Sequence, residues 1–384
     1  MKKTSKIVAV VLAALLVVAA VVVLGACAKE QTAVAYGLVH KKGYVGKATA
    51  TVKGETLTAA DLNEACLPTQ VKATAADGEF AVDVEGTDKE GNPTHTYYWK
   101  TVKWANVTAT YDVTDGYKVG EQTLVEFFLL EANCEVYFEA VAANNVTVVT
   151  ASGDKKDIMN ASTLLKTENG YWGTPADTAL GWKANVDATI NYVLENGFDG
   201  ASKKSDFTAK DNSATDKRLE NEWVDKNGKN TGATWTDMWD YFNLLKIAND
   251  RAIAAVDGEV VTGEYTYVSW GNQYGAKVDV VVKDGKIVSV KLYTDDETGW
   301  VRTSPDWKEN QHEGDLGFTK TEAAYEQWIN DTFVGKTVDD VKAYKTDTTI
   351  SNWTISDGAK LAGATQSAVR IVLAVQNALG KLAK

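Results

Sequence analysis

Two short turns carry the residue types in this chain that are best suited to hold a ligand. Residues 231–236 read T-G-A-T-W-T and residues 362–367 read A-G-A-T-Q-S. Glycine permits backbone conformations that other residues resist, and the Thr or Ser two places after each G-A-T is a good helix N-cap. We therefore expect each turn to open a helix, with Thr236 and Ser367 as the capping residues.

A turn of this kind can bind a phosphate group. The N-terminus of a helix presents unpaired N–H groups and a partial positive charge, and both stabilise an anion. The small residues Gly232, Ala233, Gly363 and Ala364 would let a phosphate approach the backbone closely. The hydroxyl groups of the two Thr residues at the ends of the motifs could bind the phosphate or be esterified by it. These are Thr234 and Thr365. A plain helix entry uses the same residues, so one such turn alone would indicate little.

The two turns lie at equivalent places in an internal repeat. Tyr44–Lys53 and Tyr274–Lys283 each read as an alternating strand, and each is followed by a turn and a second strand. The Asp-Gly pair at 284–285 is a strong hairpin signal. A helical segment follows in each copy, over 185–197 and over 321–330. Each copy then closes with G-A-T and an amphipathic helix, so the whole order of parts recurs.

The repeat predicts an α+β fold with two related domains, each an antiparallel sheet packed with helices. The first domain would span 36–253 and the second 258–384. The first copy is about twice as long because it carries an insertion over about 72–170, which we interpret as β-rich. One of its strand-like stretches is Cys134–Phe138. The polar stretch 199–230 is typical of a loop.

The N-terminus predicts export and lipid anchoring. Residues 1–26 combine a basic start with an unbroken apolar stretch, and Leu24-Gly-Ala-Cys27 looks like the cleavage site of bacterial lipoproteins. We expect 1–26 to be a signal peptide, Cys27 to be lipidated and 27–35 to be a tether. The alternative is an uncleaved anchor helix, since this stretch is long enough to span a bilayer. Either way the rest of the chain lies on the extracytoplasmic side of the cell membrane.

Charge and cysteine content exclude some classes of function. The 384 residues carry a net charge of −12 at pH 7. An acidic protein is a poor partner for nucleic acid. Cys66 and Cys134 could form a disulfide outside the cytoplasm or remain as buried thiols. The three His residues are far apart and no Cys/His pair has ligand spacing, so we expect no metal site. No nucleophile–base–acid constellation and no Walker-type loop is present.

These motifs together resemble a known family. The strand pair Tyr274–Ile287, then a helix, then G-A-T before a terminal amphipathic helix, is similar to the FMN-binding domain. That domain occurs in sodium-pumping quinone oxidoreductases, in electron-transport complexes, and as tandem copies in surface lipoproteins used for extracellular electron transfer. The resemblance covers most of 258–384 and the two ends of 36–253.

The resemblance implies FMN as the cofactor, esterified through its phosphate by a flavin transferase to Thr234 and Thr365. Thr231, Thr236 and Ser367 would belong to the same turns, and Trp235 could stack on the flavin ring. The family's modified sites carry Asp six residues before the Thr, where this chain has Gly228 and Ala359. Covalent FMN, non-covalent FMN and a repeat that has lost its flavin therefore stay open.

The sequence thus predicts a membrane-anchored flavoprotein that passes electrons from a membrane donor to an external acceptor. It would be a redox carrier rather than a turnover enzyme. The main alternative is a surface lipoprotein whose repeat is structural and whose aromatic loops bind a peptide, sugar or nutrient. Three tryptophans of the second copy could cover a flavin ring or, in the alternative, a bound sugar: Trp270, Trp300 and Trp307.

Overall fold

The fold is α+β in a computed structural model of the chain. The structure describes residues 29–166, 180–209, 222–235, 237–269, 272–299, 302–303, 322–348, 354–355, 359 and 365–382. Cys27, Thr236, Gly363, Ala364, Trp270, Trp300 and Trp307, on which predictions were made, lie outside these residues.

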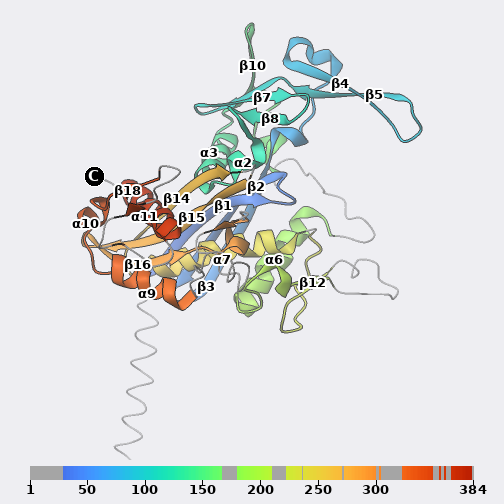
Figure 1. The fold of residues 1–384 in the computed structure, drawn as a ribbon. Helices are drawn as coiled ribbons and strands as arrows, with labels where there is room; N and C mark the ends of the chain where they lie inside the picture. The colour runs from blue at the N-terminus through green and yellow to red at the C-terminus, as the bar shows by residue number, and fades with distance from the viewer. Residues whose placement is uncertain are drawn as a thin grey trace, which may run out of the picture.

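The first sheet is a three-stranded antiparallel meander in the order β1-β2-β3 (Figure 1). Its strands are β1 (Glu30–Val39), β2 (Tyr44–Lys53) and β3 (Thr56–Cys66). Helix α7 (Met238–Ala254) packs against β1 and β2, and helix α6 (Trp182–Asn196) packs against β3. The hairpin and both helices confirm the sequence prediction. Strand β1 was missed: it begins at Glu30, inside the stretch predicted to be a tether, because its alternating residues pair along the whole of β2.

The second sheet has the same order of parts. Strands β14 (Glu259–Ser269), β15 (Asn272–Lys283) and β16 (Lys286–Leu292) form an antiparallel meander, with the short strand β17 (Arg302–Thr303) beside β15. Helix α11 (Thr365–Gly380) packs on β14 and β15, and helix α9 (Glu322–Phe333) packs on β16. Asp284 and Gly285 both have positive φ, of 50° and 72°. That conformation is the one an Asp-Gly hairpin turn requires.

The two meanders also share an irregularity. The register between β2 and β3 shifts between Thr51 and Val52, and the register between β15 and β16 shifts between Val281 and Val282. In each sheet the shift lies just before the Lys that ends the middle strand. A β-bulge of this kind adds a residue to one strand and increases the local twist.

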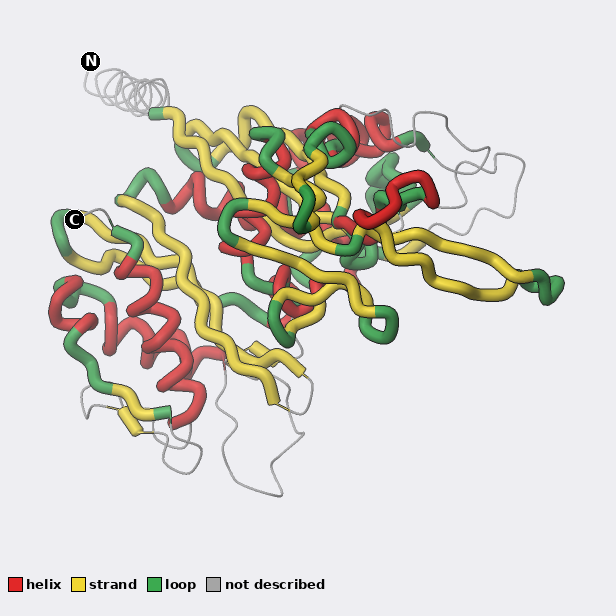
Figure 2. Tube along the Cα trace, turned by 90° about the horizontal axis from the view of Figure 1, so that it is seen from above, coloured by secondary structure: helices red, strands yellow, loops and turns green. Residues whose placement is uncertain are grey.

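A large segment between β3 and α6 adds a further sheet, and its buried residues share one apolar cluster with the first sheet. Its main part is a six-stranded sheet in the order β11-β10-β6-β7-β8-β9, and the hairpin β4–β5 extends away from the body (Figures 1 and 2). The strands are β4 (Ala81–Thr87), β5 (Pro93–Trp99), β6 (Thr101–Trp104), β7 (Val107–Asp112), β8 (Gly116–Val119), β9 (Gln122–Thr123), β10 (Val146–Thr150) and β11 (Gly153–Lys155). The segment also contains helices α2 (Leu124–Phe128), α3 (Glu131–Ala142) and α4 (Ala161–Leu164), and the short 3-10 helices η1 (Pro68–Gln70) and η2 (Ala75–Phe80).

The predicted strand at Cys134–Phe138 is wrong, because these residues lie in helix α3. The buried positions of this helix include Cys134, Tyr137, Phe138 and Val141. A spacing of three and four residues is that of one helix face. β-branched and aromatic residues favour a strand locally, but burial of this face against the first sheet decides the outcome.

The remaining elements are short. They are η3 (Lys204–Asp206), β12 (Thr208–Ala209), β13 (Trp223–Val224), α8 (Asp295–Thr298), α10 (Val338–Lys342), β18 (Thr346–Asp347) and β19 (Thr354–Ile355). Strands β12 and β13 pair with each other within the stretch predicted to be a loop.

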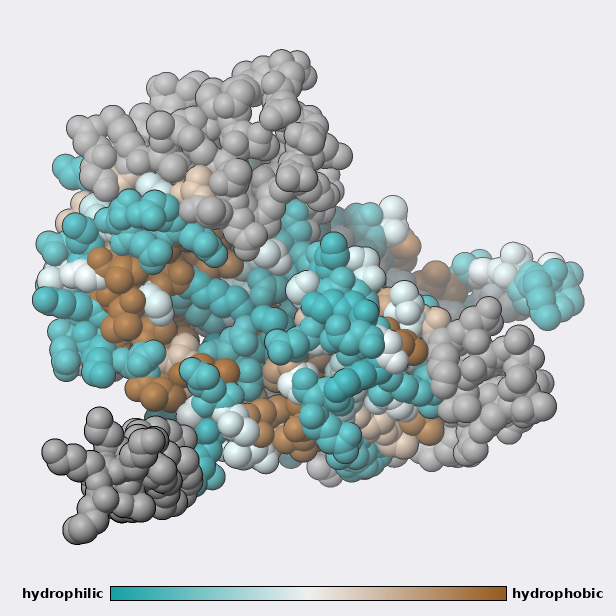
Figure 3. Space-filling model, turned by 90° about the horizontal axis from the view of Figure 1, so that it is seen from below, coloured by the Kyte–Doolittle hydropathy of each residue, from teal (hydrophilic) through white to brown (hydrophobic). Residues whose placement is uncertain are grey.

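Buried apolar side chains form two clusters. One contains residues from Ala35 to Ala248 together with Tyr293, and the other contains residues from Val261 to Leu379. On one outer face, hydrophilic residues cover most of the described surface, with smaller hydrophobic patches between them (Figure 3).

Candidate functional site

The first G-A-T turn lies between helix α6 and the start of helix α7. Gly232 has φ of 70°, which is the left-handed conformation that the motif predicts for glycine. Thr231 N–H donates to the Trp223 carbonyl at 2.9 Å, and Trp223 N–H donates to the Ala233 carbonyl at 3.2 Å. The turn is therefore held against strand β13 by backbone hydrogen bonds on both sides.

The N–H groups of the turn are bonded to oxygens of side chains in the same chain. Gly232 N–H donates to Asn230 Oδ1 at 2.9 Å, and Ala233 N–H donates to Thr231 Oγ1 at 3.2 Å. Thr234 N–H donates to Asn185 Oδ1 at 2.6 Å. These three donors are the ones that a phosphate at the turn would need.

The Thr234 hydroxyl is also engaged. Thr234 is 8% exposed, its Oγ1 accepts from Leu180 N–H at 2.8 Å, and its hydroxyl lies 3.2 Å from Asn185 Oδ1. In this arrangement the residues around Thr234 do not fit a phosphoester, since a phosphate there would displace the Leu180 and Asn185 contacts.

Trp235 packs inside the protein. Its ring is 4% exposed and stacks on Tyr241 with 3.8 Å between ring centroids. Its Nε1–H donates to Thr189 Oγ1 at 2.7 Å. The Tyr241 hydroxyl donates in turn to Glu64, which is fully buried. A flavin ring is thus not required to explain the position of Trp235.

Two acidic residues lie at the start of α7. Helix α7 begins at Met238, four residues after Thr234, and Asp240 lies in its first turn. Its N-cap is Asp237, so the prediction of Thr236 as the capping residue is wrong. Burial, together with the neighbouring Asp237, raises the pKa of Asp240 to about 7. Two acidic side chains therefore lie close to this helix end, and they disfavour a further anion there.

The second turn differs at its helix. Thr365 is the first residue of α11, whose first turn contains no acidic residue. The structure gives the Thr365 backbone but not its side chain. Ser367 lies inside the first turn of α11, so its prediction as the N-cap is wrong; the helix begins two residues earlier, at the motif's Thr.

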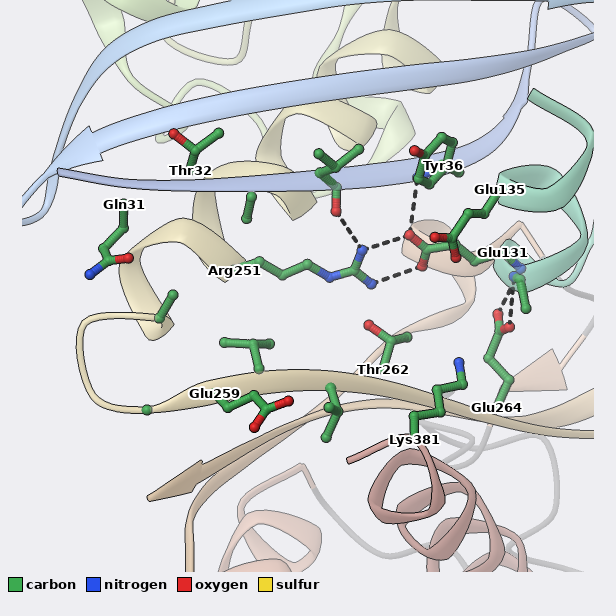
Figure 4. A pocket seen from close by; sticks show the side chains of 17 residues that line it. Gln31, Thr32, Tyr36, Glu131, Glu135, Arg251, Glu259, Thr262, Glu264 and Lys381 are labelled. Carbon is green, nitrogen blue, oxygen red and sulfur yellow. Dashed lines mark hydrogen bonds and ion pairs between the residues drawn. The ribbon is translucent and has the colours of Figure 1, made fainter. Parts of the chain in front are cut away.

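A second polar site, missed by sequence reasoning, lies between the two sheets. Arg251 of α7 points across the gap between β1 and β14 toward Glu131 at the start of α3 (Figure 4). Its guanidinium makes two bonds to Glu131, at 2.6 and 2.8 Å, and two to Asp279, at 2.8 and 3.1 Å. A fifth bond reaches the Val34 carbonyl at 3.0 Å. All five N–H donors of Arg251 are thereby used.

Two more charges complete this interface cluster, which we define as Glu131, Arg251, Glu264, Lys277 and Asp279. Lys277 Nζ lies 2.8 Å from Glu131 Oε2, and Glu264 accepts from Glu131 N–H at 3.0 Å. Burial alone would raise the pKa of Glu131, but Arg251 and Lys277 outweigh it and hold that pKa well below its usual range. Burial raises the pKa of Glu264.

A cleft of about 580 Å³ opens beside the interface cluster. It lies between strands β1 and β14, with Thr32 and Thr262 on its opposite walls and Lys381 at its side (Figure 4). Its size is in the range of small-molecule sites. Because Arg251 is fully bonded, a ligand would meet the strand edges and the outer polar side chains rather than that guanidinium.

Both Cys66 and Cys134 are buried free thiols, so the disulfide alternative is not realised. Burial raises the pKa of the Cys66 thiol to about 12. In the described part of the chain, no group of three or more His, Cys, Asp or Glu side chains is placed to hold a metal ion. Among the same residues no helix is long and apolar enough to cross a membrane.

Comparison of the chain with protein-family models, with curated proteins and with solved structures found no match.

Proposed function

We propose that this chain is a membrane-anchored, extracytoplasmic flavoprotein that carries electrons through FMN. The proposal treats it as two copies of one FMN-binding-like unit, 36–253 and 258–384. The observation that supports a duplication most is the shared bulge, at Thr51/Val52 and at Val281/Val282. Strand pairing alone does not require a bulge at matching places. Each sheet is also packed by two helices in the same order along the chain. Helices α6 and α9 pack on the third strand of their sheets, and α7 and α11 pack on the first two strands.

In this proposal Thr365 is the residue that carries FMN. Helix α11 begins at this residue and has no acidic side chain in its first turn, so its partial positive charge is available to a phosphate. The start of α7 has Asp237 and Asp240 instead. Gly363 and Ala364 would provide the close approach to the backbone that the family resemblance implies.

The chain's own part is placement. A lipid on Cys27 would hold the protein at the membrane, near a membrane electron donor, and the acidic fold would face an external acceptor. Bound FMN would supply the redox chemistry, as cofactors do in general. A flavin transferase would be needed to form the ester bond. The protein would then act as a redox carrier rather than as a turnover enzyme.

The test is flavin retention by the full-length chain after co-expression with a flavin transferase and purification from membranes in detergent. We expect flavin fluorescence that stays with the acid-precipitated protein. Thr365→Val should abolish this fluorescence, while the matched control Thr365→Ser should keep it because the hydroxyl remains. Flavin found in the supernatant would instead indicate non-covalent FMN.

A colourless protein in every preparation would favour the alternative, a surface binding module. The cleft between β1 and β14 is the observation that favours it, because a cleft of about 580 Å³ could hold a small ligand. In that case the repeat would be structural, and the two sheets would serve to form the walls of the cleft.

A further inference from the structure

The first G-A-T turn is filled by a side chain of its own unit. Asn185, in the first turn of α6, is 4% exposed and lies directly over Thr234. Its amide oxygen accepts from Thr234 N–H at 2.6 Å and lies 3.2 Å from Thr234 Oγ1. An acceptor oxygen thus occupies the position from which a phosphate oxygen would contact the same two groups.

The other end of the Asn185 side chain is fixed as well. Its amide nitrogen donates to the Leu180 carbonyl at 3.0 Å and to the Gly181 carbonyl at 3.3 Å. Leu180 N–H in turn donates to Thr234 Oγ1 at 2.8 Å. Asn185, Leu180 and Thr234 therefore form a closed ring of hydrogen bonds that joins the entry of α6 to the turn.

This ring leaves few polar groups for an external ligand. Gly232 N–H and Ala233 N–H are bonded to Asn230 and Thr231. A ligand at Thr234 would have to break at least three hydrogen bonds in a buried site. A buried polar group left without a partner destabilises the arrangement that leaves it so.

We infer that Asn185 is the internal ligand of the first turn and that it excludes a phosphate or a phosphoester from Thr234. Asn185 is thus a specificity-determining residue, because it limits attachment of FMN to the second turn. In the first turn it has a structural role, since it connects the entry of α6 to the segment that leads into α7. The part of this inference that concerns FMN rests on the proposed function. The ring of hydrogen bonds among Asn185, Leu180 and Thr234 is independent of the proposed function.

The first test is peptide mapping by mass spectrometry of the full-length chain co-expressed with a flavin transferase. We expect the added mass on the peptide that contains Thr365 and none on the peptide that contains Thr234. Thr234→Val should therefore load as fully as the unchanged chain. FMN on Thr234, in the unchanged chain or in Thr365→Val, would overturn the inference while leaving the flavoprotein proposal standing.

The second test does not depend on flavin, because it measures the bond between Asn185 and the Thr234 N–H. It therefore still applies when no flavin is attached anywhere, a result that would contradict the proposed function. Amide hydrogen exchange at Thr234 is measured by mass spectrometry with electron-transfer fragmentation. Asn185→Ala should speed this exchange at least about tenfold, because it removes the acceptor of the Thr234 N–H. Asn185→Asp keeps an acceptor oxygen and should restore most of the protection.

The matched control is Asn196→Ala. Asn196 lies at the other end of α6, where its amide nitrogen donates to the Tyr192 carbonyl and its amide oxygen accepts from the Lys229 side chain, so neither bond involves Thr234. It should leave exchange at Thr234 unchanged. Equal exchange at Thr234 in the unchanged chain and in Asn185→Ala would overturn the inference, and so would an equal increase in Asn185→Ala and Asn196→Ala.

Discussion

Replacement of Arg251 by Met should weaken the fold more than any change of a surface charge. Met has nearly the helix propensity of Arg and a long unbranched side chain, so the backbone of α7 is little affected. The change removes five hydrogen bonds. It also leaves the carboxylates of Glu131 and Asp279, with side chains 8% and 6% exposed, without their main counter-charge.

The expected cost follows from that burial. Loss of one partner of a buried ion pair costs about 3–5 kcal/mol, mostly because the remaining charge stays desolvated. Lys277 still neutralises part of Glu131, and Thr262 still donates to Asp279 at 2.6 Å. We therefore expect Arg251→Met to lower the free energy of unfolding by about 3–4 kcal/mol, in the lower part of that range.

The assay is urea unfolding at pH 7, followed by tryptophan fluorescence and by circular dichroism. Lys246→Met is the matched control on the same helix, because Lys246 is partly exposed and pairs with Asp250 at 2.8 Å. It should cost less than about 1 kcal/mol. Adding Asp279→Asn to Arg251→Met should recover part of the loss, since it removes one uncompensated charge. An Arg251→Met variant as stable as the Lys246→Met control would refute the reasoning.

Three further predictions concern single residues. The pKa of Asp240 is about 7 in the fold and ordinarily 3.8, so its protonation supports the fold at low pH and this support is lost as pH rises from about 4 through 7. Asp240→Asn should therefore raise the melting temperature more at pH 8 than at pH 5 and change it least near pH 3. The exposed Asp257→Asn is the matched control. A Cβ at Gly263 would collide with the Ala374 carbonyl and the Ala378 nitrogen. Gly263→Ala should therefore lower the free energy of unfolding in urea by about 1–3 kcal/mol. Gly380→Ala is the control and should not destabilise the protein, because a Cβ there would meet no atom within 4 Å. Cys66 and Cys134 are 0% exposed, and alkylation with iodoacetamide at pH 8 should modify them only after denaturation; modification of either thiol in the native protein would contradict their placement.

Local patterns were enough to predict the two hairpins and the four helices that build the repeat. The Asp284-Gly285 turn and the apolar stripes of α6, α7, α9 and α11 are patterns of residues close together in the sequence. Such patterns indicate local structure without knowledge of the tertiary fold. The strand predicted at Cys134–Phe138 failed because the same residues also fit a helical face. Spacing over the whole of 131–142 would have revealed the helix.

The site was harder to predict because its partners are far apart in the sequence. Asn185 and Thr234 belong to different elements, and no local pattern shows that one fills the other's hydrogen bonds. The sequence contains one signal for Arg251, because this residue follows Leu244 and Ala248 on the same buried face of α7. A charged residue in such a stripe indicates buried partners, but their identity depends on the tertiary fold.

The measurement that tests the central claim most directly is the intact mass of the full-length chain after co-expression with a flavin transferase, with and without Thr365→Val. Our account predicts one added FMN, joined through a phosphoester, in the unchanged chain and none in the variant. No added mass in the unchanged chain, together with no yellow colour, would contradict the flavoprotein proposal and leave the cleft between β1 and β14 as the site to investigate.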